Sequence, residues 1–241
     1  MILAAALVLA AAGFVAACAR LPGGGGARPW WFLAGIGALA VALVSPVHGW
    51  SERSLAGHMV QHVLLISLAA PLLAAAHPFE AVARSGRPDH VAPRPGATRS
   101  GRDKVVSAGG LAAVGVVQVG VLLGWHVPAS FDAAVAHQPL HDVEHLTLLA
   151  SAFALWAVLL RARDGAAVVA LFFATLPAMG YGVALTLAGT TWYAPYPDLH
   201  DQQLAGVVMW AYGGLLAVGG GVLLAIEWLR RAERSTPGWL G

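Results

Sequence analysis

The sequence predicts an all-α fold, a polytopic integral membrane bundle of about seven transmembrane helices. The first observation is composition, because the 241 residues are 58% hydrophobic and only 11% charged, whereas soluble domains carry about 25% charged residues. The second is a mean hydropathy of +0.70. The third is the recurrence of apolar runs about 20 residues long, the length that crosses a bilayer as a helix. Backbone groups must pair within such a segment in lipid, which favours helices over open strands.

We expect these spans to form a single transmembrane domain, 1–241, without a separate soluble domain. The seven runs lie at about residues 1–19, 30–47, 55–77, 105–124, 139–160, 166–189 and 202–229. Pro71 and Pro177 fall inside two of them, where proline removes a backbone hydrogen bond and should kink the helix. The one long polar connection, 78–104, is rich in Pro, Gly and Arg. We expect it to be a cytoplasmic loop.

The positions of the basic residues predict the orientation. Every Lys and Arg except Arg53 falls in an odd-numbered connection or in the C-terminal tail. The positive-inside rule places these segments and the C terminus in the cytoplasm, and the N terminus outside. The first run ends in VAAC, a loose match to a lipoprotein cleavage box, but no Lys or Arg precedes it. We therefore expect an uncleaved first span.

Histidines concentrate at the outer end of this topology. Of the ten, all except His77 and His90 lie there. They include two pairs with HxxxH spacing near the outer ends of spans, at His58, His62, His141 and His145. The same end carries Glu144, Asp201, Gln202 and Gln203. Ionisable residues within membrane segments are rare and usually functional. The alternative role for the four histidines is hydrogen bonding between helices.

The HxxxH spacing is suited to metal binding. Residues four apart lie one above the other on a helix, with Cβ atoms about 5–6 Å apart, so two ring nitrogens can bind one ion at about 2.0 Å. Two pairs from neighbouring helices would complete one four-nitrogen site or two adjacent sites. Imidazole suits copper, zinc, iron and nickel. Glu144 or Asp201 could accept the other ring N–H, and Met59 or Met209 could add a soft donor. Cys18 is the only cysteine, which excludes a Cys-based site and an internal disulfide.

Four segments resemble the CtaG-type, multi-span cytochrome c oxidase assembly factors. They are HMVQHVLLISLAAPLLA (58–74), WHVPASFDAAV (125–135), HDVEHLTLLASAFALW (141–156) and DQQLAGVVMW (201–210). The residues that match the motifs are His58, Gln61, His62, Trp125, His126, His141, Glu144, His145, Asp201, Gln202, Gly206, Met209 and Trp210. The chain departs from the family at 69–73, where AAPLL replaces the usual double proline. The resemblance implies a polytopic membrane protein that is needed to build active haem-copper oxidase, with copper delivery as its role.

We therefore expect a bacterial plasma (inner) membrane protein that holds copper at its outer face and is not an enzyme. The expected metal ligands are His58, His62, His126, His141 and His145, with supporting contacts from Glu144, Asp201, Gln202 and Met209. The expected partners are a cytochrome c oxidase subunit, the lipid bilayer and a periplasmic or other extracytoplasmic copper chaperone, and no nucleic acid. Acid should expel the metal, because the histidines must be neutral to bind it.

Three other functions fit parts of the pattern. The histidines could be the entrance of a copper or proton-coupled metal transporter, but such a path needs polar relays in mid-membrane. The inner halves of the spans offer few such relays, at Ser67, Gln118, Ser151 and Thr175. Two histidines on facing helices could instead ligate haem iron. HDVEH also matches the H-x-x-E-H pattern of an intramembrane zinc protease, but the sequence shows no route for a peptide substrate.

Overall fold

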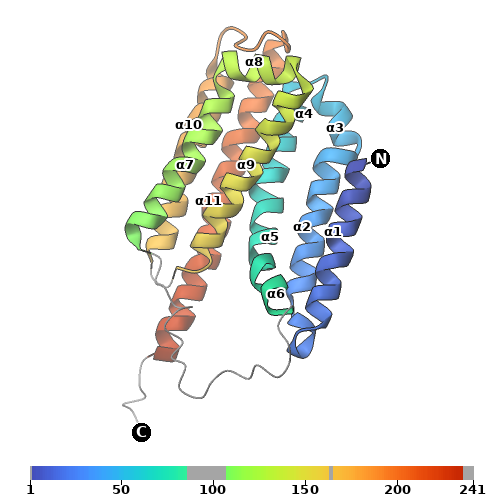
Figure 1. Ribbon diagram of the computed structural model, residues 1–241. Helices are drawn as coiled ribbons and strands as arrows, with labels where there is room; N and C mark the ends of the chain where they lie inside the picture. The colour runs from blue at the N-terminus through green and yellow to red at the C-terminus, as the bar shows by residue number, and fades with distance from the viewer. Residues whose placement is uncertain (1, 86–106, 163–164, 236–241) are drawn as a thin grey trace.

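The computed structural model describes residues 2–85, 107–162 and 165–235, and in these ranges it is helical without strands. The long helices and their connections run in chain order through one bundle (Figure 1). The elements are α1 (Ile2–Ala19), η1 (Pro22–Gly25), α2 (Arg28–Val44), α3 (Pro46–Ser51), α4 (Leu55–Val63), η2 (Leu64–Ala69), α5 (Ala70–Ala75), α6 (Pro78–Ser85), α7 (Ala108–His126), α8 (Pro128–Ala136), α9 (Gln138–Leu159), α10 (Ala166–Leu187) and α11 (Leu199–Ser235).

Six helical segments of the described chain are long and apolar enough to cross a membrane. They are Gly23–Val44, Leu55–Ser85, Ala108–His126, Gln138–Leu159, Ala166–Leu187 and Leu199–Glu233. The first predicted span, 1–19, corresponds to α1, whose apolar part, Ala4–Ala19, is shorter. The all-helical, multi-span architecture predicted from composition is thus confirmed, with six candidate spans.

Two short helices occupy connections that the sequence analysis left without structure. α3 begins at Pro46, and the Ser45 side chain caps it by accepting a hydrogen bond from the Val47 amide. α8 begins at Pro128. Proline is well suited to the first turn of a helix, because its fixed φ fits and its missing N–H would be unpaired there anyway. Both helices lie at the end of the bundle where α4 and α9 begin (Figure 1).

The third span changes its helical pitch just before Pro71. The chain forms a π-helical turn over Leu64–Ala69 between α4 and α5. Pro71 has no N–H to offer the carbonyl four residues earlier, and a wider turn is one way to accommodate this loss. Pro177, by contrast, lies inside α10, which continues from Ala166 to Leu187. Kinks were predicted at both prolines. The span with Pro71 contains a π turn, whereas α10 continues through Pro177.

The closest helix pair is α10 and α11, which meet at two glycines. A Cβ added at Gly206 would lie 2.5 Å from the Gly182 carbonyl oxygen, and one added at Gly182 would lie 2.8 Å from the Gly206 carbonyl oxygen. No side chain fits at these separations, so the two backbones pack directly against each other. This contact fixes the start of α11 beside α4, with which α11 also packs.

The two ends of the bundle differ in charge. The α2–α4, α7–α9 and α10–α11 connections lie together at the upper end in Figure 1, and α6 lies at the lower end. At the lower end Arg161 and Arg84 pair with Glu80, and Arg231 pairs with Glu227. Of the predicted cytoplasmic loop 78–104, only the part within α6 belongs to the described residues. The histidine-bearing end of the bundle is therefore opposite the described arginine pairs.

Candidate metal centre

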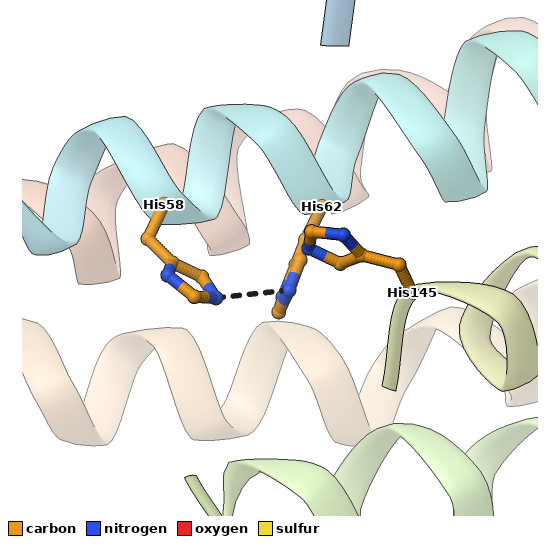
Figure 2. A group of neighbouring side chains, drawn as sticks. All are labelled: His58, His62 and His145. Carbon is orange, nitrogen blue, oxygen red and sulfur yellow. Dashed lines mark hydrogen bonds between the residues drawn. The ribbon is translucent and has the colours of Figure 1, made fainter. Parts of the chain in front are cut away.

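Four histidines and one glutamate from two helices meet near the upper end of the bundle. The His58 and His62 rings project from one face of α4, and Figure 2 shows the His145 ring of α9 lying against them. The ring centroids of His58 and His141 are 5.2 Å apart, and those of His62 and His145 are 5.4 Å apart. The two HxxxH pairs therefore face each other in one cluster, and Glu144 lies beside them on α9.

The ring nitrogens within this cluster are spaced as metal ligands are. The Nε2 atoms of His58 and His62 are 3.0 Å apart (Figure 2), and two nitrogens on one tetrahedral ion at 2.0 Å are about 3.3 Å apart. Two sets of three residues place their ligand atoms within 4.8 Å of one another. One set is His58, His62 and His145, and the other is His58, His141 and Glu144.

The cluster contains several buried polar atoms without a hydrogen-bond partner among the described residues. They are His62 Nδ1, His141 Nε2, His145 Nε2 and both carboxylate oxygens of Glu144. The Glu144 side chain is fully buried, and its oxygens lie 3.6 Å from His62 Nε2 and 3.9 Å from His141 Nε2, beyond hydrogen-bonding distance. Burying a carboxylate and several imidazoles without partners is costly. A cation bound among them would satisfy both the charge and the free lone pairs, so the residues fit a metal ion.

Tyr196, in the connection between α10 and α11, fixes the protonation of His58. Its hydroxyl donates to the Ser51 carbonyl at 2.7 Å and lies 3.3 Å from His58 Nδ1. Since the single hydroxyl proton is used on Ser51, the phenol oxygen accepts a hydrogen bond from His58 Nδ1–H. The remaining lone pair of His58 is then on Nε2, the atom that faces His62. This is the arrangement that outer-shell partners impose on metal-binding histidines.

The phenols above the cluster remain neutral donors. Burial raises the pKa of Tyr196 above its ordinary value, and the carboxylate of Asp201 raises it further. Burial likewise raises the pKa of Tyr193, whose hydroxyl donates to the His126 carbonyl at 2.8 Å. Tyr181 donates to the same carbonyl. The connection between α10 and α11 is thereby hydrogen bonded to α3 and to the end of α7.

His126, at the end of α7, borders the cluster without belonging to either set of three. Its ring centroid lies 5.5 Å from that of His62. Nδ1 lies 2.7 Å from the Leu122 carbonyl oxygen, to which it donates, so the lone pair is on Nε2. That nitrogen is buried and has no partner within the described part of the chain. His126 thus has a free lone pair on a third helix, in a ring that lies beside His62.

Three other residues predicted to support the metal make different contacts. The Asp201 carboxylate accepts hydrogen bonds from the Ser54 hydroxyl and from the Leu55 amide, and so caps the start of α4. Gln202 bonds to the Trp192 amide and the Thr190 carbonyl, which fixes the α10–α11 connection. Met209 packs in the apolar core that also contains Met59. These residues position the helices that carry the cluster.

The remaining histidines lie outside the cluster. His48, in α3, is 39% exposed and lies 3.9 Å from Glu52. His137 and His200 are exposed at the start of α9 and α11. His77 lies at the other end of the bundle, between α5 and α6. His90 is outside the described residues. Concentration at one end was predicted for the eight histidines other than His77 and His90, and of these the two HxxxH pairs and His126 lie together in the interior of the described bundle.

Tyr193 and Tyr196 were not among the site residues predicted from the sequence. Both lie in a connection without helical periodicity, and neither is part of a metal-binding motif. Their bonds reach His126 and Ser51, 67 and 145 residues away along the chain. The available signal was position, since the segment WYAPYPD enters α11 at the same end as the histidines.

A comparison with family models identifies the family of this chain. The model described as cytochrome c oxidase caa3 assembly factor (Caa3_CtaG) matches residues 8–231. The chain belongs to this family. No curated protein and no solved structure matches the chain. The resemblance seen in the four sequence segments is thus confirmed, and in this assembly factor those segments lie on α4 with η2 and α5, the α7–α8 junction, α9 and α11. They are the elements that hold or surround the histidine cluster.

Proposed function

We propose that this assembly factor holds a single copper ion in the histidine cluster and passes it to a cytochrome c oxidase subunit. The observation that carries the proposal is the convergence of two HxxxH pairs in a member of an oxidase assembly family. In these pairs His62 Nδ1, His141 Nε2 and His145 Nε2 have no hydrogen-bond partner among the described residues. Imidazole is a good ligand for copper, and copper is a component that a haem-copper oxidase must receive. In this proposal copper is the cargo of the protein, and the protein does not need to catalyse a reaction.

The chemistry of His58 supports one ion and not two. His58 belongs to both sets of three ligands. A neutral imidazole has one N–H group and one free lone pair, and His58 donates its N–H from Nδ1 to the Tyr196 oxygen. His58 can therefore bind only one ion, at Nε2. The two sets are alternative or overlapping parts of one centre, in which His62, His145, His141 and Glu144 complete the coordination around His58.

The position of the cluster supports delivery at the outer face of a bacterial plasma membrane. His58 is the fourth residue of α4 and His145 the eighth of α9, so at about 1.5 Å per residue both lie within roughly 12 Å of the helix starts. The arginine pairs are at the opposite end, which the positive-inside rule assigns to the cytoplasm. Copper supplied by an extracytoplasmic chaperone would then reach an oxidase subunit without crossing the bilayer.

Substitution of individual histidines tests the proposal in cells. His62→Ala or His145→Ala should abolish oxidase activity, because each removes a buried ligand, while the protein stays in the membrane at a near-normal level. His200→Ala is the matched control, since this exposed histidine lies at the same end of the bundle but outside the cluster. Equal loss of oxidase activity in all three variants would contradict the proposal, as would normal activity in His62→Ala and His145→Ala.

A further inference from the structure

A small cavity lies inside the bundle, on the inner side of the metal centre. Its volume is about 80 Å³, and its wall includes residues from η2, α7, α9, α10 and α11. Three of its lining residues are polar, namely Ser67, Gln118 and Thr175. These are three of the four polar residues that the sequence scatters through the inner halves of the spans. The fold therefore brings together side chains that lie far apart along the chain.

Gln118 is the lining residue of this cavity whose side-chain oxygen lacks a hydrogen-bond partner within the described chain. Its side chain is only 4% exposed, and its Oε1 atom has no hydrogen-bond partner among the described residues. An amide oxygen without a partner in the hydrocarbon region of a membrane is costly, because no lipid group can donate a hydrogen bond to it. The cavity beside Gln118 is the available place for a donor.

The size of the cavity and the three polar residues in its mostly apolar wall match a small water cluster. One water occupies about 30 Å³ of liquid volume and makes about three hydrogen bonds when buried, so about 80 Å³ accommodates two or three molecules. The Thr175 hydroxyl donates to the Leu171 carbonyl, which leaves its oxygen free to accept. Ser67 lies in the π-helical turn Leu64–Ala69. Donors and acceptors for a small water cluster are therefore present on three helical elements.

We propose that this cavity is an internal hydration site, which binds two or three water molecules between Ser67, Gln118 and Thr175. The site lies directly beneath the metal centre. Leu122 lines it and provides the carbonyl to which His126 Nδ1 donates. Met209 lines it as well, and packs in the same apolar core as Met59, the neighbour of His58. This inference does not depend on which ion the histidines bind.

The hydration site adjoins a larger cavity on the side away from the histidine cluster. Toward the lower end it shares Ser67, Trp156 and Leu216 with a second, mostly apolar cavity of about 390 Å³ that reaches Glu227 and Arg231. An ion that keeps six waters needs roughly 180 Å³ at 30 Å³ for each water, more than twice the volume of the hydration site. The hydration site therefore accommodates water but not an ion with six waters.

X-ray radiolytic footprinting of the purified full chain tests the site. A short X-ray pulse converts bound water into hydroxyl radicals, and a neighbouring methionine is oxidised to the sulfoxide, which mass spectrometry measures. Met209 lines the site and is 8% exposed, whereas Met59 is 1% exposed and lines none of the cavities above. We expect Met209 to be oxidised at least about five-fold faster than Met59. Equal slow oxidation of both residues in the wild type would overturn the proposal.

Variants of the lining residues test whether the oxidation of Met209 depends on the hydration site. Gln118→Leu removes the polar group and should lower Met209 oxidation to the rate of Met59. Thr175→Val keeps the shape of the side chain but removes one acceptor, so it should lower the rate of Met209 oxidation in part. It provides the same test if Gln118→Leu does not fold. Neither residue contacts the histidines, so copper content should not change. Met209 oxidation that is unaffected by both variants would also overturn the proposal.

Discussion

At the residue scale, the histidine cluster depends on side chains that set the direction of each lone pair. His58 illustrates this, because its ring would be free to donate or accept at either nitrogen without a neighbour. The Tyr196 hydroxyl, which donates to the Ser51 carbonyl, makes Nδ1 the donor and leaves the lone pair on Nε2. His126 is fixed in the same sense by the Leu122 carbonyl. Both constraints come from hydrogen bonds outside the HxxxH motifs.

Removing the Tyr196 hydroxyl should weaken copper binding. Tyr196→Phe keeps the ring but leaves His58 Nδ1 without its acceptor, and loss of such an outer-shell contact typically costs 10–100-fold in metal affinity. We expect a rise in the copper dissociation constant of about that size, measured by competition with a chelator.

The control for this experiment is Tyr212→Phe, on α11. The Tyr212 hydroxyl forms no hydrogen bond with other described residues, so its loss should leave the copper dissociation constant unchanged. Nuclear magnetic resonance of ring ¹⁵N nuclei in His58 provides a second measurement, since the proton should be on Nδ1 in the wild type. A wild-type affinity in Tyr196→Phe, or a His58 proton on Nε2, would contradict the assigned role.

At the element scale, the position of α11 is set by its direct backbone contact with α10. Gly206 belongs to the DQQLAGVVMW segment, and a Cβ at this position would be 2.5 Å from both the Gly182 carbonyl oxygen and the Thr186 hydroxyl. This contact lies one to two turns from Asp201, which caps α4. Packing between α10 and α11 is thereby connected to the helix that carries His58 and His62.

Substitution of Gly206 should separate these helices. Gly206→Ala inserts a methyl group where two backbones touch, and such overpacking typically costs about 1–3 kcal/mol. We expect a lower melting temperature in detergent and a weaker copper affinity. Gly219→Ala, on the same helix, is the matched control, because its Cβ would meet nothing within 4 Å. Alanine favours a helix over glycine by about 1 kcal/mol, so Gly219→Ala should be neutral or stabilising. Equal melting temperatures for both variants would contradict the close contact.

Much of this organisation follows from local sequence patterns, and the rest depends on contacts between distant segments. Apolar runs near 20 residues predicted the helices, and the 3.6-residue period placed His58 with His62 and His141 with His145. The short helices α3 and α8 were missed, because they are too short for hydrophobic periodicity and begin at Pro46 and Pro128. The roles of Asp201 and Tyr196 were missed because their partners are about 145 residues away. Sequence spacing alone carries no information on such contacts.

At the scale of the whole molecule, the bundle has a histidine end and an arginine end. At one end Arg161 links the α9–α10 connection to α6 and Arg231 links it to α11, and the histidine cluster lies near the other end. A protein that exchanges a metal at one membrane face needs this kind of asymmetry, with ligands near one surface and an apolar interior behind them. The orientation of the bundle decides which compartment the centre serves.

Cysteine accessibility tests the orientation. A cysteine at Ala129, which is exposed on α8, should react with a membrane-impermeant thiol reagent added to intact cells from outside. A cysteine at Ser100, in the basic connection outside the described residues, should react only after the membrane is opened. The native Cys18 is fully buried and should contribute little background. The reverse pattern would place the histidine end in the cytoplasm and would remove the argument for delivery outside.

The central claim is that both HxxxH pairs form one centre for one copper ion, and copper content measures it most directly. Purified wild-type protein should contain about one copper per chain, as expected when His58 has a single free lone pair. The double variants His58→Ala/His62→Ala and His141→Ala/His145→Ala should lose copper to the same extent as the quadruple variant, because two imidazoles alone hold copper weakly. Two coppers in the wild type, with one retained in each double variant, would contradict a single shared centre.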